Sequence, residues 1–178
     1  MTSRLALGFS VHTGWAAALV AGGNARHPRI EAREIVELLD DRARFVYHRA
    51  AEQSPAKAKR DLEEARREAI ARAQEGIARL GHERRLACVA IVARQGALLP
   101  LEQIVVAHPR IHLSEGLFYR DVLLAAAERS GLAVQVISPK ALDTDDPALA
   151  AAGRSLGAPW GKDQKLAALA AWHALAGR

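Results

Sequence analysis

A chain of 178 residues, half of them hydrophobic, can bury the core of one globular domain, which we expect over residues 1–178. The formal net charge of +5 is spread over segments of mixed sign, so it permits an anionic partner such as DNA or RNA without requiring one. The one cysteine, Cys88, excludes an intrachain disulfide, and no apolar run reaches the roughly 20 residues of a membrane helix. No secretory signal pattern follows Met1, so we expect a cytoplasmic protein with no membrane partner.

The N-terminal part of the chain predicts three antiparallel strands. Apolar runs from Leu5 to Ser10 and from Trp15 to Ala21 flank a polar turn and indicate a hairpin. Both faces of this hairpin are apolar, so we expect it inside a sheet that is covered on both sides. Residues 29–39 largely alternate between charged and apolar side chains, which predicts a third strand near an edge of the sheet.

Helices and strands alternate in the rest of the chain. Apolar residues at helical spacing predict a long helix from Ala56 to Leu80, whose charges of both signs indicate a solvated face rather than a nucleic-acid clamp. The continuous apolar run from Arg85 to Ala93 predicts a central parallel strand. After it we expect, in chain order, a short helix following Pro100, a helix from Ser114 that ends before Gly131, a short strand over residues 132–138, a long loop with one helical turn over residues 143–161, and a last helix over residues 162–175.

This order of elements predicts the fold class. Strands joined by a crossover helix run parallel, because the helix returns the chain to the same end of the sheet. We therefore expect an α/β fold, with a mixed sheet of three antiparallel strands followed by two parallel strands, and helices on both faces. The order resembles that of the ribonuclease H-like superfamily, which comprises nucleases, resolvases and transposases.

Two segments are similar to those of the RuvC-type resolvases within that superfamily. In the first hairpin of these resolvases a glycine ends strand one, a turn with Thr-Gly follows, and an aromatic residue opens strand two. The residues of this chain that match in kind are Gly8, Thr13, Gly14 and Trp15. The final segment from Gly161 resembles their last helix, which is rich in alanine and leucine and opens with an acid. The resemblance implies a nucleic-acid partner and a metal-dependent phosphodiester hydrolase.

The same resemblance implies acidic residues at the end of strand one, at the end of strand four and at the start of the last helix. There they hold two divalent cations, Mg²⁺ or Mn²⁺, on either side of the scissile phosphate. Here strand one ends in Phe9 and Ser10, the fourth strand runs into residues 93–95 without an acid, and only Asp163 matches. A single carboxylate offers too few ligands for such a site. We therefore expect an incomplete set of acidic metal ligands and no ordinary two-metal mechanism.

The candidate catalytic residues are Ser10, His12, Glu115 and Asp163. His12 lies in the first turn, at the end of the sheet where ligands of such folds bind, and could act as a general base oriented by Ser10. Glu115 and Asp163, with His112, would hold a metal. The residues expected to meet phosphates or bases are Thr13, Arg120, Trp160, Lys162 and Lys165. Each candidate also has a simpler explanation. His12 would be a solvated loop histidine, Asp163 an acid in the first turn of a helix, and Trp160 a tryptophan that packs over a loop.

A second polar cluster lies in the sequence HPRIHLSEGLFYRD. On one continuous helix His108, His112 and Glu115 would share a face, although Pro109 weakens that interpretation. Two histidines and a carboxylate could bind zinc or another transition metal. The alternative is a helix entry with exposed histidines and a glutamate that the helix dipole favours.

Three functional hypotheses follow. The first is a diverged ribonuclease H-like protein that binds or processes nucleic acid. The second is a non-catalytic interaction module. It would bind a protein partner, or a second copy of itself as a homodimer, through an exposed region around Trp160 and Trp172. The third is a small-phosphate or nucleotide binder, which the absence of any glycine-rich phosphate-binding motif disfavours.

Overall fold

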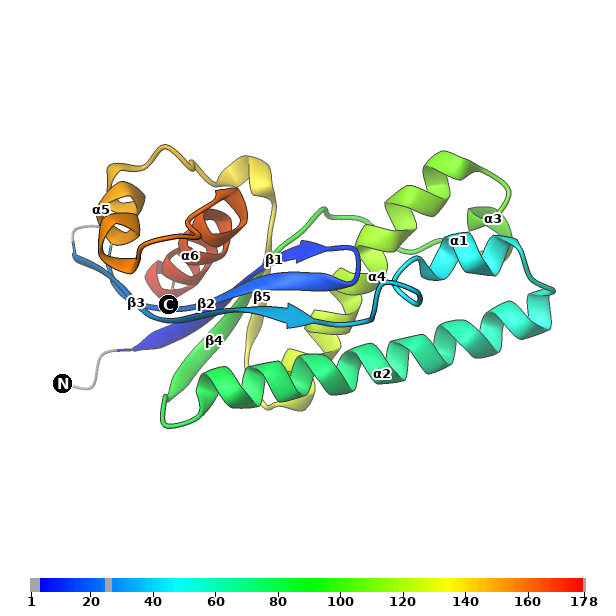
Figure 1. Ribbon diagram of the computed structural model, residues 1–178, viewed down its shortest axis with the longest axis horizontal. Helices are drawn as coiled ribbons and strands as arrows, with labels where there is room; N and C mark the ends of the chain where they lie inside the picture. The colour runs from blue at the N-terminus through cyan, green and yellow to red at the C-terminus, as the bar shows by residue number, and fades with distance from the viewer. Residues whose placement is uncertain (1–3, 25–26, 178) are drawn as a thin grey trace.

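The computed structural model describes residues 4–24 and 27–177 and contains one five-stranded sheet (Figure 1). Its strands are β1 (Leu5–His12), β2 (Trp15–Asn24), β3 (His27–Glu37), β4 (Leu86–Val92) and β5 (Val134–Ile137), in the order β3-β2-β1-β4-β5. The first three strands pair antiparallel, and β4 pairs parallel with both β1 and β5. The predicted mixed sheet, with the third strand at an edge, is therefore confirmed.

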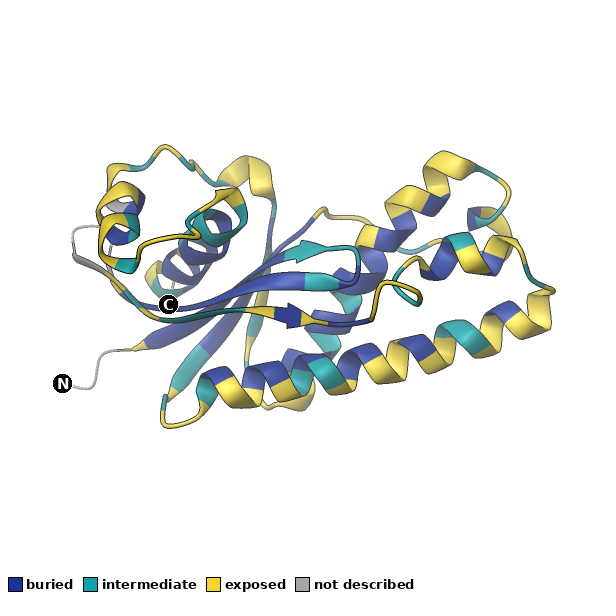
Figure 2. Ribbon diagram, viewed as in Figure 1, coloured by how far each residue is buried: buried dark blue, intermediate teal, exposed yellow. Residues whose placement is uncertain are grey.

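Helices cover both faces of the sheet, as predicted. They are α1 (Val46–Ala51), α2 (Pro55–Gly81), α3 (Leu101–Ile104), α4 (His108–Arg129), α5 (Pro147–Leu156) and α6 (Lys162–Ala176), with a 3₁₀ turn over Pro139–Ala141. Alternate residues of β1 enter different cores: Leu7 and Phe9 pack with α2 and α4, whereas Ala6 packs with α6. Figure 2 shows the central strands buried and an exposed side running along α2. None of the helices in the described ranges is long and apolar enough to cross a membrane.

Small residues bring α6 very close to β1. A side chain on Gly8 would clash with the backbone carbonyl of Ala167, so the strand can carry only glycine where the helix crosses it. The side of α6 that faces the sheet is built mostly from buried alanines, among them Ala167, Ala170 and Ala171. The alanine-rich, aromatic-poor composition thus has a structural use, because it lets the start of α6 lie against the end of β1.

Three helical segments differ from the sequence prediction. Helix α4 begins at His108 rather than Ser114, because Pro109 occupies the first turn, where a missing backbone N–H costs nothing. Helix α5 spans ten residues where we expected a loop with a single turn. Helix α1 was not predicted at all; it is only six residues long and depends on contacts with α2 and α4.

The two tryptophans expected to mediate self-association both form hydrogen bonds within the fold. Trp172 is buried, and its indole N–H donates a hydrogen bond to the carbonyl of Gly22 at 3.0 Å. The indole of Trp160 donates to the carbonyl of Leu149 at 3.0 Å and covers Gly153, so it holds α5 against the start of α6. Trp172 is therefore not available to a partner, whereas Trp160 is only partly buried, and self-association stays a prediction.

Candidate functional site

Three of the four predicted catalytic residues meet where β1 ends and α6 begins. Ser10 Oγ donates to Asp163 Oδ1 at 3.2 Å, and His12 Nε2 lies 2.7 Å from the same oxygen. Ser10 is buried, whereas the side chains of His12 and Asp163 are 39% and 31% exposed. We call Ser10, His12 and Asp163 the first-turn site.

The imidazole of His12 is held in a defined orientation. It stacks on the indole of Trp15, its cross-strand neighbour, with ring centroids 4.1 Å apart and planes 4° from parallel. Because Nε2 contacts Asp163, Nδ1 is the ring nitrogen that this contact leaves available. A carboxylate that fixes one nitrogen of a histidine is the arrangement that prepares the other nitrogen for proton transfer or ligand binding.

The turn between β1 and β2 is fixed by Gly14. Its φ of +88° is readily adopted only by glycine, and an added side chain would run into that of Arg44. The carbonyl of Gly14 accepts N–H bonds from Leu38 and Leu39, which tie the turn to the segment after β3. Thr13 lies in this turn, half-buried.

Helix α6 brings positive charge to the first-turn site. Lys162 and Lys165 lie in its first turn on either side of Asp163, and neither lysine is buried. Gly161 caps the helix, and its N–H donates to the side chain of Gln164 at 3.0 Å. Helix N-termini favour anions, because their backbone N–H groups point outward along the helix dipole.

The residues present do not fit a pair of divalent cations. The parallel register places Ser10 beside Val92, so the ends of β1 and β4 lie next to each other, as such a site would require. However, β4 is followed by Ala93 and Arg94, and the one carboxylate, that of Asp163, already accepts hydrogen bonds from Ser10 and His12. Hard cations such as Mg²⁺ need several oxygen ligands, and the described residues at these strand ends do not supply them.

Glu115 lies elsewhere and has a different role from the one expected. It is buried, and its carboxylate accepts the backbone N–H groups of Val46, Tyr47 and His48, at 3.2, 2.9 and 3.2 Å. These N–H groups open α1, which lacks a capping side chain of its own. Burial raises the pKa of Glu115, and hydrogen bonds from the side chain and backbone of His48 oppose that rise. Glu115 therefore fixes α1 and does not share a metal with Asp163.

Arg120 also has a structural role instead of the expected contact with phosphate. Its Nη1 donates to the carbonyls of Arg94 and Gly96 at 3.1 and 2.7 Å, and its other nitrogens contact Asp121. The residue is only 8% exposed. The guanidinium therefore fixes the loop that leaves β4.

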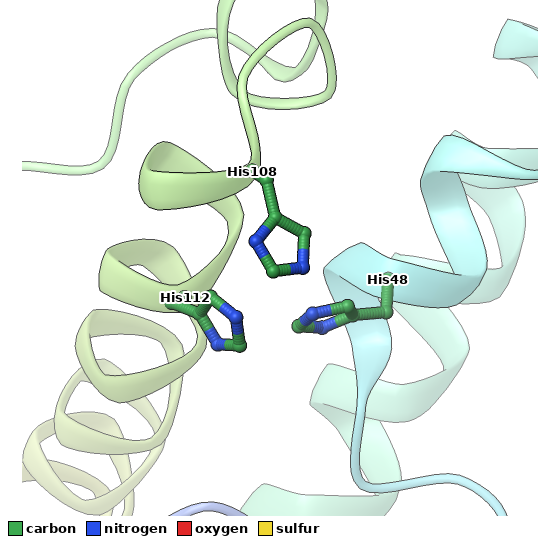
Figure 3. A group of neighbouring side chains, drawn as sticks. All are labelled: His48, His108 and His112. Carbon is green, nitrogen blue, oxygen red and sulfur yellow. The ribbon is translucent and has the colours of Figure 1, made fainter.

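Three histidines converge between α1 and α4 (Figure 3). His108 and His112 lie one turn apart on α4, and His48 joins them from α1. The ring centroids are 4.3 Å apart for His108 and His112, 4.8 Å for His48 and His112, and 5.5 Å for His48 and His108. Sequence analysis identified the two histidines of α4 but not His48, which lies 60 residues earlier in an unpredicted helix. We call these three residues the histidine cluster.

A hollow of about 510 Å³ connects the strand ends with the start of α4. Its lining includes Val11 from β1, Ala93 and Arg94 after β4, and Pro109 and His112 from α4. We call it the strand-end hollow. A second hollow, of about 690 Å³, is lined by Gly14 and Trp15 and by residues of the segment after β3.

At the level of sequence, no protein family and no curated protein matches this chain. At the level of structure, it is similar to Thermus thermophilus RuvC in complex with a Holliday junction substrate, with a TM-score of 0.58 over 98% of this chain and 95% of that chain. The fold is RuvC-like. A second T. thermophilus RuvC structure gives a TM-score of 0.56 with the same coverage, and both are 16% identical to this chain. The yeast mitochondrial Holliday junction resolvase Ydc2 is 12% identical, with a TM-score of 0.41 over 86% of this chain and 56% of that chain.

Proposed function

We propose that this protein binds nucleic acid, with branched DNA as its preferred form, across the first-turn site and the strand-end hollow. The observation that carries the proposal is the meeting of Ser10, His12 and Asp163 at the ends of β1 and β4. It occurs on a RuvC-like fold, and the T. thermophilus RuvC that this chain resembles over nearly its whole length was solved with a Holliday junction.

The charges at the strand ends support an anionic partner. Lys162 and Lys165 flank the first-turn site, and Arg94, at the end of β4, lines the strand-end hollow and is exposed. Phosphate contacts by such side chains release condensed counterions, and that release supplies much of the free energy of nucleic-acid binding. Asp163 is the only carboxylate of the first-turn site, and its Oδ1 lies 2.7 Å from His12 Nε2.

The proposal is binding rather than metal-dependent hydrolysis. The ligands for two Mg²⁺ or Mn²⁺ ions are not brought together, so we expect neither metal to raise the affinity for DNA above that measured in EDTA. Within the first-turn site, His12 is the side chain placed to accept a proton, and Asp163 is the group that orients it.

Fluorescence anisotropy with labelled single-stranded, duplex and four-way-branched DNA tests the proposal at several salt concentrations. We expect the branched form to bind most tightly, and the Lys162→Ala/Lys165→Ala variant to bind more weakly, with a salt slope reduced by about 2. Light scattering of the same samples measures whether a monomer or a dimer binds.

The control variant is Lys59→Ala/Arg60→Ala. It removes the same charge from an exposed part of α2, which packs on the opposite face of the sheet from α6. Equal losses in the two variants would mean that only net charge matters. The proposal would be rejected if the wild-type protein bound none of the three DNA forms.

A further inference from the structure

The histidine cluster has the composition and geometry of a metal site. Its donor nitrogens all lie within 4.8 Å of one another. Three nitrogens bound to one Zn²⁺ at 2.0–2.1 Å in tetrahedral geometry lie about 3.3 Å apart. His108 and His112 are both exposed, so rotation of their side chains can close the remaining distance. Within the described residues, this is the one group of three or more His, Cys, Asp or Glu side chains arranged to hold a metal ion.

Glu115 supplies the supporting contact that such sites usually have. His48 Nδ1 lies 3.1 Å from Glu115 Oε1, so a proton on Nδ1 is donated to the carboxylate and Nε2 is left as the metal-binding nitrogen. The side chain of Glu115 is 3% exposed and is fixed by the N–H groups of α1. A buried carboxylate that fixes the tautomer of a ligating histidine raises the affinity of a site for its metal.

We propose that His48, His108 and His112 bind one Zn²⁺ ion, with Glu115 as the positioning residue for His48. Imidazole nitrogen is a good ligand for Zn²⁺ and a poor one for Mg²⁺ or Ca²⁺, which prefer oxygen. Three histidines leave one of four tetrahedral positions open to an outside ligand, as in zinc sites that bind water or substrate. His112 also lines the strand-end hollow, so the proposed zinc site borders the surface proposed above to bind DNA. The zinc proposal stands on its own geometry and does not depend on DNA binding.

The first experiment is zinc titration of the full chain, with any polyhistidine tag removed, against a chromophoric chelator. We expect one equivalent of Zn²⁺ to bind to the wild type and the His108→Ala/His112→Ala variant to bind it at least a hundredfold more weakly. Both histidines are exposed, so the variant is expected to fold, and circular dichroism without metal checks this. Co²⁺ in place of Zn²⁺ should give the strong visible absorption of a four-coordinate site in the wild type but not in the His108→Ala/His112→Ala variant.

The matched control is His82→Ala/His173→Ala, which removes two exposed histidines outside the cluster. It should bind Zn²⁺ as the wild type does. The positioning role is tested separately by Glu115→Gln, which we expect to weaken zinc binding by 10- to 100-fold while Co²⁺ still shows a four-coordinate spectrum. Failure of the wild type to bind Zn²⁺, or equal binding by the wild type and the His108→Ala/His112→Ala variant, would overturn the proposal.

Discussion

The first-turn site and the histidine cluster each pair a histidine with a carboxylate, but in opposite environments. Asp163 is about one-third exposed and contacts His12 at 2.7 Å, whereas Glu115 is buried and contacts His48 at 3.1 Å. Glu115 also accepts three backbone N–H groups, whereas Asp163 contacts the side chains of Ser10 and His12. The buried carboxylate thus fixes both backbone and a histidine inside the fold, whereas the exposed one joins two side chains at the surface.

The largest effect is expected from Gly8→Ala, which tests whether the two regions are built independently. The added methyl group would push α6 away from β1 and separate Asp163 from Ser10, at a cost of about 3 kcal/mol in the free energy of unfolding. Urea denaturation measures the loss. Gly116→Ala on α4 is the control, since nothing lies within 4 Å of the added atom, and it should not destabilise the protein. If the Gly8 variant still folds, it should retain zinc binding, because α1 and α4 pack on the other face of the sheet.

Zinc itself should stabilise the folded protein by a similar amount. At a free concentration 100 times its dissociation constant, a ligand that binds only the native state adds about 2.7 kcal/mol. We therefore expect a higher melting temperature in Zn²⁺ than in EDTA for the wild type. His108→Ala/His112→Ala should melt at the same temperature in both buffers, which calorimetry would show.

Removing each carboxylate in turn tests the contrast between buried and exposed pairs. Glu115→Gln places an amide NH₂ against backbone donors of α1, so we expect a loss of about 2 kcal/mol in metal-free buffer. Asp163→Asn should cost no more than about 0.5 kcal/mol, because exposed ion pairs contribute little. Urea denaturation measures both changes. Equal losses of unfolding free energy in the two variants would contradict the different roles of the buried and the exposed carboxylate.

The smallest effect concerns DNA binding by Asp163→Asn. The substitution removes one negative charge from the basic face, so affinity for branched DNA should rise about two- to fivefold at low salt. Anisotropy measures this change, with Asp143→Asn as an exposed control in the segment before α5. A loss of affinity that appears only in Mn²⁺ would instead show that Asp163 holds a metal.

The sequence by itself determined the fold class and the layers. Alternation in β3, the apolar runs of β1, β2 and β4, and the helical spacing of α2 and α6 are local patterns, and each reports which side of an element is buried. The order of these elements then left few topologies, because crossover connections constrain strand direction. The sequence also showed that Asp163 is alone among the expected acids, since that conclusion needs only the identity of residues at the strand ends.

The tertiary structure alone decided which polar residues meet. His12 and Asp163 are 151 positions apart and His48 and Glu115 are 67 apart, so no local period relates them. Glu115 and Arg120 looked like site residues in the sequence, yet they satisfy backbone groups that become buried only when α1 and the loop after β4 pack against α4. Periodicity predicts which side of a helix is buried, but the partner of a buried charge depends on the packing of distant segments.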